Sequence, residues 1–405
     1  MMSQKTKIII TAAVALVLLV LVIFFFGFRE TETAGEPRGF FGGLFPKPAE
    51  VTPAPTAQEV PPIRIEDIAT ILAPGQNTAT IPRWTLIALG DDPVRSLGVT
   101  NNTVRYHKNT PENLGHLFER TKEALGDEAR ISNLLLQQIE EIQWSPDGNT
   151  ALVSYRDEEL NVRSFLVFYK GTTTPKTRFI ENDIKTLAFS PDSKSIAYTL
   201  KNNDSYDVFT ATTDFRNQRR VLSNNIPSFE ISWPTANMLA LKTKSSYEIA
   251  SFLYNIPTAG GILNRIFGGR GLDAVWNRAG MHVVLSRVNS NGRPLALTLL
   301  GVSTGEQATL PFTTLAEKCV FGKENPNMLY CGVPKFIPAG HFPDEWWQGK
   351  VALQDTIIAY DLREKKQIAS VNTLSDVVNQ EIFDDDSYLF FQDKNTEKLW
   401  AVKLK

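Results

Sequence analysis

The sequence has few residues of the types that bind zinc. It contains two cysteines and four histidines in 405 residues, with no Cys-x-x-Cys or His-x-x-x-His pair. A structural zinc site needs four such ligands, usually in closely spaced pairs. We therefore expect no metal centre, and no motif of the chain implies a cofactor.

The chain also lacks an excess of charge of one sign. Its 42 Lys and Arg against 44 Asp and Glu leave a formal net charge of −2. Binding to nucleic acid depends on a concentrated basic surface that neutralises phosphates. A nucleic-acid partner is therefore not expected.

Charged residues are absent from Ile8 to Phe28, an apolar run of 21 residues. In a helix this run is about 30 Å long, the thickness of a hydrocarbon core. A cleavable signal peptide has a shorter apolar region and a small-residue cleavage site, which this segment lacks. The run predicts an uncleaved transmembrane anchor, with residues 1–28 forming the cytoplasmic N-terminus and the anchor.

The charges beside the anchor predict its orientation. Lys5 and Lys7 precede the run, whereas Arg29 and the acids at 30, 32 and 36 follow it. Under the positive-inside rule the N-terminus is cytoplasmic. The C-terminal part is then extracytoplasmic, in the periplasm or at the cell surface.

Proline and glycine dominate residues 29–62, with prolines at 37, 46, 48, 53, 55, 61 and 62. Such a segment favours an extended, semi-rigid linker over a packed helix. Its aromatic cluster, Phe40 to Phe45, is either a patch at the bilayer interface or a short docking motif for a partner.

Two segments after the linker resemble each other. Trp144 is followed by Ser-Pro-Asp-Gly and an apolar strand, and Phe189 is followed by Ser-Pro-Asp-Ser and an apolar strand. Proline presets the first dihedral of such a turn, while Asp and Gly tolerate its remaining geometry. The two aromatics are 45 residues apart.

Weaker copies continue this period. The anchor aromatics are Trp144, Phe189, Trp233, Trp276, Phe321 and Phe383. Their spacing is 43 to 45 residues except for the last interval, which returns to the period if about 334–353 is an insertion. A degraded copy covers residues 97–106. Several short strands in each unit of 40 to 45 residues are typical of a propeller blade. We therefore expect an all-β propeller over 63–405, with seven four-stranded blades and the six aromatics in the blade core.

At these residues the chain resembles the TolB-type, WD-like propeller repeat, whose hallmark is an aromatic followed by Ser-Pro-Asp-Gly. The likeness is good after Trp144 and Phe189 and covers about residues 90–405. The arrangement of anchor, linker and propeller also resembles uncharacterised bacterial surface proteins. The resemblance implies a fold and a cell-envelope setting, since propellers host many unrelated activities.

Residues 111–125 fit two interpretations. They carry a proline at the first turn and a glycine stop, as a helix does. The repeat instead predicts an inner strand at 115–121, and we favour the strand because the period is a longer-range constraint.

Three motifs suggest chemistry but have simpler interpretations. Gly301-Val-Ser-Thr-Gly305 has the hydrolase pattern but is followed by a strand, so we expect a hairpin turn. Gly268 to Gly271 lacks the spacing of a phosphate-binding loop, so we expect a flexible connection between blades. Asp384 to Asp386 offers calcium ligands but occupies the turn position of the repeat.

The two cysteines suggest a disulfide. Cys319 and Cys331 lie symmetrically about residue 325, so a simple hairpin makes them cross-strand partners. An oxidising location favours the bond, and two buried free thiols are the alternative.

The insertion is the best candidate binding site, because long loops often carry binding residues. Its candidate residues are His341, Phe342, Asp344, Glu345, Trp346 and Trp347. They suit stacking on a sugar or anchoring a protein partner. The alternative is that the two tryptophans fill the gap between the loop and the blade.

The sequence therefore favours a non-enzymatic, membrane-tethered propeller that binds an envelope protein or another cell-envelope component. One rival is a propeller enzyme of the lactonase or glycan-cleaving type. The four scattered histidines at 107, 116, 282 and 341 argue against it. A receptor for glycan or peptidoglycan is the third hypothesis.

Overall fold

The computed structural model describes residues 69–405, except for short gaps at 73–77, 109, 114, 137, 170–173, 181–183, 203–204 and 227–228. The described residues belong to the second of two units in the chain, Pro62–Lys405. The predicted anchor and linker lie outside the described residues, so they stay predictions. Among the described residues, no helix is long and apolar enough to cross a membrane.

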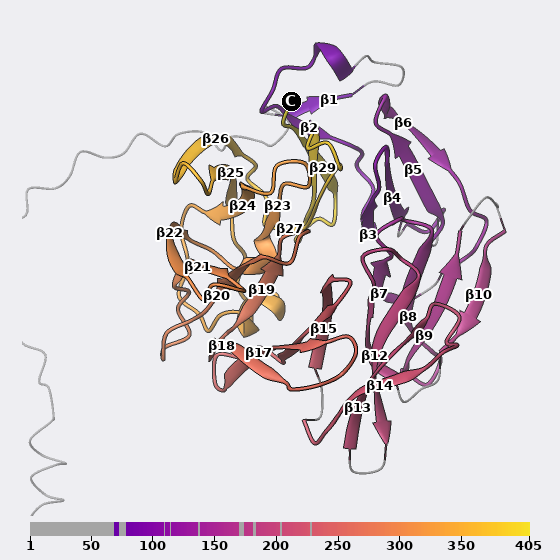
Figure 1. The fold of residues 1–405 in the computed structure, drawn as a ribbon. Helices are drawn as coiled ribbons and strands as arrows, with labels where there is room; N and C mark the ends of the chain where they lie inside the picture. The colour runs from indigo at the N-terminus through magenta and orange to yellow at the C-terminus, as the bar shows by residue number, and fades with distance from the viewer. Residues whose placement is uncertain are drawn as a thin grey trace, which may run out of the picture. The chain divides into compact units, whose positions relative to one another are not determined.

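Seven sheets form the blades of a propeller (Figure 1). The strands of blades 1 to 3 are β3 Val94–Val99, β4 Thr103–Lys108, β5 Leu117–Thr121, β6 Ala124–Arg130; β7 Ile139–Trp144, β8 Thr150–Arg156, β9 Val162–Phe168, β10 Lys176–Phe179; and β11 Ile184–Phe189, β12 Ser195–Asn202, β13 Ser205–Thr212, β14 Arg219–Asn224. The expected all-β propeller with seven blades is confirmed.

Blades 4 to 6 have the same order of strands. Their strands are β15 Phe229–Thr235, β16 Met238–Thr243, β17 Ala250–Pro257, β18 Asn264–Arg270; β19 Asp273–Trp276, β20 His282–Ser286, β21 Ala296–Gly301, β22 Gln307–Thr313; and β23 Cys319–Phe321, β24 Met328–Pro334, β25 Asp355–Asp361, β26 Lys366–Asn372. The 3-10 turn η3, Ala316–Lys318, precedes β23, and the short helix α2, Asp344–Trp347, lies between β24 and β25.

Blade 7 joins the two ends of the described chain. It contains β27 Val377–Ile382, β28 Tyr388–Asp393 and β29 Leu399–Lys403, followed by β2 Leu86–Ala88 and β1 Ala69–Ile71. The 3-10 turn η2, Thr78–Thr80, lies between β1 and β2. Ile87 of β2 pairs with Ala401 of β29 in an antiparallel ladder, and β1 adds a parallel fifth strand. The ring is therefore closed by main-chain hydrogen bonds between its first and last strands.

The first strand of each of blades 1 to 6 is the innermost, and the same holds for β27 of blade 7 (Figure 1). Apolar residues between neighbouring blades make the core: one cluster joins Val104 and Tyr106 of blade 1 to Phe383 and Phe390 of blade 7. A four-stranded sheet cannot bury both of its faces by itself, so each blade depends on its neighbours.

Residues 117–121 form a strand, as the repeat predicted, and the helix interpretation is wrong. The expected inner position is also wrong, because β5 is the third strand of its blade. The glycine-rich segment at 268–271 is likewise not a loop. Gly268 and Gly269 belong to β18, and only Gly271, with a positive φ of 59°, makes the connection to β19.

We expect Ile87→Ala to destabilise the protein by roughly 2–4 kcal/mol, because Ile87 is fully buried in the closure between blades 7 and 1. Ile71→Ala, in edge strand β1, is the control. Ile71 is 70% exposed, so that change should alter stability by less than about 0.5 kcal/mol. Urea unfolding of the full chain measures both values, and equal effects would contradict closure by β2.

Candidate functional site

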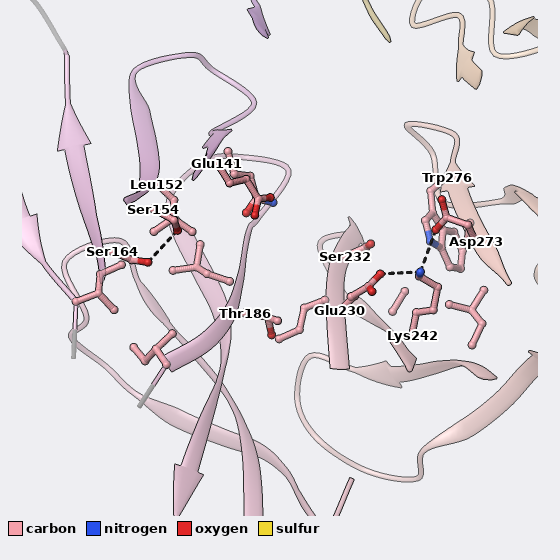
Figure 2. Close-up of a pocket in the computed structure, with 18 residues that line it drawn as sticks. Glu141, Leu152, Ser154, Ser164, Thr186, Glu230, Ser232, Lys242, Asp273 and Trp276 are labelled. Carbon is pink, nitrogen blue, oxygen red and sulfur yellow. Dashed lines mark hydrogen bonds and ion pairs between the residues drawn. The ribbon is translucent and has the colours of Figure 1, made fainter. Parts of the chain in front are cut away.

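Two cavities share lining residues near the axis of the propeller. The first, here called the channel cavity, has a volume of about 470 Å³ and is lined by residues of blades 2 to 5 (Figure 2). The second, here called the aromatic mouth, is also about 470 Å³ and is lined by the ends of the inner strands and the turns after them. Ser232, Ala274 and Trp276 line both cavities. The two cavities are therefore consecutive along the axis.

The aromatic mouth is formed by the repeated aromatic positions. Trp144, Trp233 and Trp276 are partly buried and line it, together with Phe189 and Phe321. Phe189, Phe321 and Phe383 are buried, as expected of blade-core residues. The three tryptophans have a second role that the sequence did not indicate, because part of each side chain faces the mouth.

In blades 2 and 3, the turn after the inner strand fixes the position of the aromatic. Ser145 Oγ accepts the N–H of Thr150 at 3.0 Å and donates to the Asp147 carboxylate at 2.7 Å. Ser190 makes the same contacts with Ser195 and Asp192 in blade 3. The Ser-Pro-Asp motif therefore closes the hairpin through its side chains, in addition to setting its backbone dihedrals.

Trp144 is packed between blades 1 and 2. Its indole lies so close to Gly98 that a Cβ at that position would be 2.7 Å from the ring. It also stacks on His107, with ring centroids 5.9 Å apart. Burial lowers the pKa of His107 to about 3, so this imidazole is neutral at ordinary pH. His107 therefore serves packing, and it carries no charge toward the mouth.

The charged groups of the channel cavity surround one lysine. Lys242 Nζ lies 2.6 Å from Glu230 Oε2 and 3.0 Å from Asp273 Oδ1, as Figure 2 shows. Burial alone lowers the pKa of Lys242, but the two carboxylates outweigh burial and hold that pKa above its usual value. Lys242 therefore stays charged and is already shared between two acids.

Glu141 is the third carboxylate of the channel cavity. No basic side chain among the described residues lies within ion-pair distance of it. Burial, and then repulsion from the Glu230 carboxylate, raise the pKa of Glu141. Among the described residues that line this cavity, three carboxylates therefore face one ammonium group, which leaves an excess of negative charge.

A fourth acid lies close to Asp273, just before β23. Burial and the Asp273 charge raise the pKa of Glu317 to about 8. Its carboxylate accepts the indole N–H of Trp347 at 2.9 Å. Trp347 therefore links the insertion to an acid of η3 that lies close to Asp273.

The six candidate residues of the insertion do not form one exposed surface. Phe342 and Trp346 are fully buried, in a cluster with Val288, Leu315 and Leu353. These two rings therefore have no exposed surface, whereas the prediction that the insertion binds a ligand stays a prediction. Trp346 fills the space between the insertion and blades 6 and 7, as the alternative proposed.

The other four residues lie at the edge of this cluster. His341 stacks on Tyr247 with ring centroids 4.3 Å apart and lies 3.2 Å from the Glu345 carboxylate. Asp344 accepts the main-chain N–H of Tyr247 at 2.9 Å. Trp347 is 39% exposed. The binding hypothesis for the insertion now depends on His341 and Trp347.

The remaining motifs are structural in the described part of the chain. Cys319 and Cys331 are direct partners across β23 and β24 and are joined by a disulfide. The segment at 301–305 is the turn between β21 and β22. Asp386 accepts main-chain N–H groups of Lys323 and Asn325 in blade 6, so it links two blades. No group of three or more His, Cys, Asp or Glu among the described residues could hold a metal ion.

The comparisons with known proteins concern the fold. No family model matches the chain, and no curated protein matches it. An oligogalacturonate lyase in complex with manganese aligns with a TM-score of 0.58 and 8% identity, covering 82% of this chain and 95% of that chain. The oligogalacturonate lyase of Vibrio parahaemolyticus aligns with a TM-score of 0.57 and 8% identity, covering 81% and 95%.

TolB from Acinetobacter baumannii aligns with a TM-score of 0.44 and 13% identity, covering 78% of this chain and 64% of that chain. This score does not place the chain nearer to TolB than to other propellers. At 8% identity the lyase alignments show a shared propeller fold and nothing about activity. The channel cavity and the aromatic mouth therefore supply the evidence on function.

We expect Trp346→Ala to destabilise the protein by roughly 3–5 kcal/mol, since it removes a fully buried ring whose N–H donates to Asp376 at 2.9 Å. Trp347→Ala should cost about 1 kcal/mol or less, because that ring is partly exposed. The free energy of unfolding in urea distinguishes the two. A larger loss for Trp347→Ala would contradict the different packing of the neighbouring tryptophans.

The raised pKa of Glu317 predicts a pH-dependent stability. Between pH 4.5 and about 8 the unfolded chain has this carboxyl ionised while the folded chain keeps it protonated, so stability falls as pH rises through this range. Glu317→Gln removes this dependence. Relative to wild type, the variant should gain up to about 5 kcal/mol between the two ends of the range. Parallel stability curves for both proteins would show that Glu317 has an ordinary pKa.

Proposed function

We propose that this protein is a binding module whose channel cavity and aromatic mouth receive a positively charged, extended segment of a partner protein. The observation that carries the proposal is the combination of three carboxylates, Glu141, Glu230 and Asp273, with one shared ammonium in a cavity next to an aromatic mouth. An added cation relieves the excess negative charge inside. Aromatic rings favour cations and flat apolar groups.

The setting of this module is part of the proposal. The apolar run from Ile8 to Phe28 holds the propeller at a membrane, with the two preceding lysines on the cytoplasmic side. The propeller then meets its partner in the cell envelope or at the cell surface. The linker at 29–62 supplies the distance between the membrane and the blades.

An enzyme of the lyase type is the weaker alternative for this cavity. Oligogalacturonate is a chain of acidic sugars, and the acids around Lys242 repel such a polyanion. The described residues also contain no donor set for a metal such as the manganese of the similar lyase. We therefore propose binding of a cation rather than cleavage of an anionic glycan.

Peptides of defined charge test this proposal with the full chain in detergent. Tetralysine should bind and quench the fluorescence of the mouth tryptophans, whereas tetraglutamate should not bind. Glu141→Gln should weaken tetralysine binding roughly tenfold, because it removes a carboxylate that has no other basic partner. Glu158→Gln is the control. Glu158 lies in the turn between β8 and β9 of the same blade and is exposed.

Equal affinity for both peptides, or no effect of Glu141→Gln, would contradict the proposal. Tighter binding of glucosamine oligomers than of tetralysine would assign the cavity to glycans instead. Turnover of oligogalacturonate, followed by the absorbance of its unsaturated product, would identify an enzyme. If Trp347→Ala lost tetralysine binding while Glu141→Gln bound tetralysine fully, the binding site would lie at the insertion.

A further inference from the structure

Lys318 is fully buried at the end of η3, just before the inner strand of blade 6. Its ammonium nitrogen lies 2.6 Å from Asp355 Oδ2 and 2.5 Å from Asp376 Oδ1. Both aspartates are also fully buried. An unpaired charge in a dry interior is strongly unfavourable, so the lysine needs these partners. One basic and two acidic groups therefore meet between blades 6 and 7 without access to water.

Apolar side chains enclose this group of three residues. The Trp346 ring lies 4.9 Å from Lys318 Nζ. Leu315 and Ala316, at the start of η3, and Leu353, at the end of the insertion, are each at most 3% exposed. The site is therefore closed on the side of η3 and on the side of the insertion.

The two oxygens of Asp355 have different surroundings. Oδ2 accepts a hydrogen bond from Lys318 and another from the main-chain N–H of Val377, at 2.7 Å. Oδ1 is buried and has no hydrogen-bond partner among the described residues. Burial raises the pKa of Asp355. This carboxyl group therefore has one oxygen placed to take up a proton and one placed against an N–H donor.

Both carboxylate oxygens of Asp376 accept hydrogen bonds from N–H groups. The Trp346 indole N–H lies 3.1 Å from Oδ1 and 2.9 Å from Oδ2, and the Leu353 main-chain N–H donates to Oδ2 at 3.0 Å. N–H donors suit a carboxylate. Asp376 is therefore placed to accept a proton from Lys318.

We propose that Lys318 and Asp355 form an intramolecular isopeptide bond. One ammonium proton first moves from Lys318 to the Asp355 carboxylate, and the resulting amine nitrogen then attacks Cγ of the protonated carboxyl. The negative charge that develops on Oδ2 is stabilised by the Val377 N–H. Asp376 accepts a proton from Nζ and passes it to the departing Oδ1 hydroxyl. One C–N bond forms, one C–O bond breaks, and one water molecule leaves.

The environment favours this reaction. In water the separated ammonium and carboxylate are well hydrated, whereas in a dry site both charges lose that hydration. Amide formation replaces the two charges with neutral groups. The new amide oxygen still accepts the hydrogen bond from the Val377 N–H. The new amide N–H still donates to the Asp376 carboxylate. No oxidant, metal or cofactor enters the balance.

The chain contains a matched control lysine. Lys242 also lies within 3.0 Å of two carboxylates, those of Glu230 and Asp273. The Glu230 side chain, however, is 49% exposed, so this pair is hydrated. If a short distance to a carboxylate were sufficient, both lysines would be cross-linked. Because the reaction also needs a site without water, we expect it only at Lys318.

Mass spectrometry of the reduced, trypsin-digested full chain tests the proposal. Trypsin should not cut after Lys318, and the peptide that contains it should be joined to peptide 351–363, which contains Asp355. The joined mass should be lower by one water than the sum of the two peptides. Trypsin should cut normally after Lys242.

Two results would overturn the proposal. The first is complete cutting after Lys318 with full recovery of free peptide 351–363. The second is a link to peptide 367–394, which contains Asp376, since this would make the wrong aspartate the acceptor.

The role of Asp376 is tested by Asp376→Asn, which keeps the size of the side chain. This variant should lose the cross-link while keeping the far-ultraviolet circular dichroism of a folded β protein. A folded variant that is cross-linked as fully as wild type would contradict proton transfer through Asp376. If the variant does not fold, the wild-type digest still decides the existence of the bond.

Discussion

Main-chain pairing between β2 and β29 closes the ring of blades, and the aromatic mouth is lined by residues of blades 1 and 7 on either side of this closure. Each blade buries its faces against two neighbours, so an open ring would leave apolar faces of two blades in water. The closing strands are short: Leu86 pairs with Val402 and Ala88 with Trp400. Burial of Ile87 among residues of blades 7 and 1 supports these few hydrogen bonds.

The two buried lysines, Lys242 in β16 and Lys318 in η3, show how hydration decides what a cluster of charges does. Lys242 shares two carboxylates in a cavity, where an exposed Glu230 and an unpaired Glu141 leave room for a further cation. Lys318 shares two carboxylates that have no exposed surface at all. In the first site the charges remain available to a ligand. In the second they are removed from solvent, which favours a neutral covalent product.

The propeller and its blade count followed from the sequence because one aromatic position recurs at a nearly constant interval. That position ends the inner strand and is held by the same turn contacts in blades 2 and 3. The closing strands could not be predicted in this way. The segment from Trp84 to Leu89 carries no turn motif, and its partner strand lies more than 300 residues later in the chain. Only the ring geometry requires such a pairing.

The candidate site was less predictable than the fold. The two tryptophans of the insertion predict a binding surface, yet Trp346 is a core residue whose N–H donates a hydrogen bond to the buried Asp376. The acids of the channel cavity, Glu141, Glu230 and Asp273, each lie three residues before a repeated tryptophan. Within one strand such an acid looks like an ordinary surface residue. Its part in a cluster of acids becomes visible only when four blades are arranged around one cavity.

A crystal structure of the full chain with tetralysine bound tests most directly whether the channel cavity and the aromatic mouth receive a cationic peptide. The account predicts an ammonium group of the peptide in the channel cavity, within hydrogen-bond distance of Glu141 or Glu230, with the peptide chain passing the tryptophans of the aromatic mouth. Peptide density on an outer blade face, or an empty channel at saturating peptide, would contradict it.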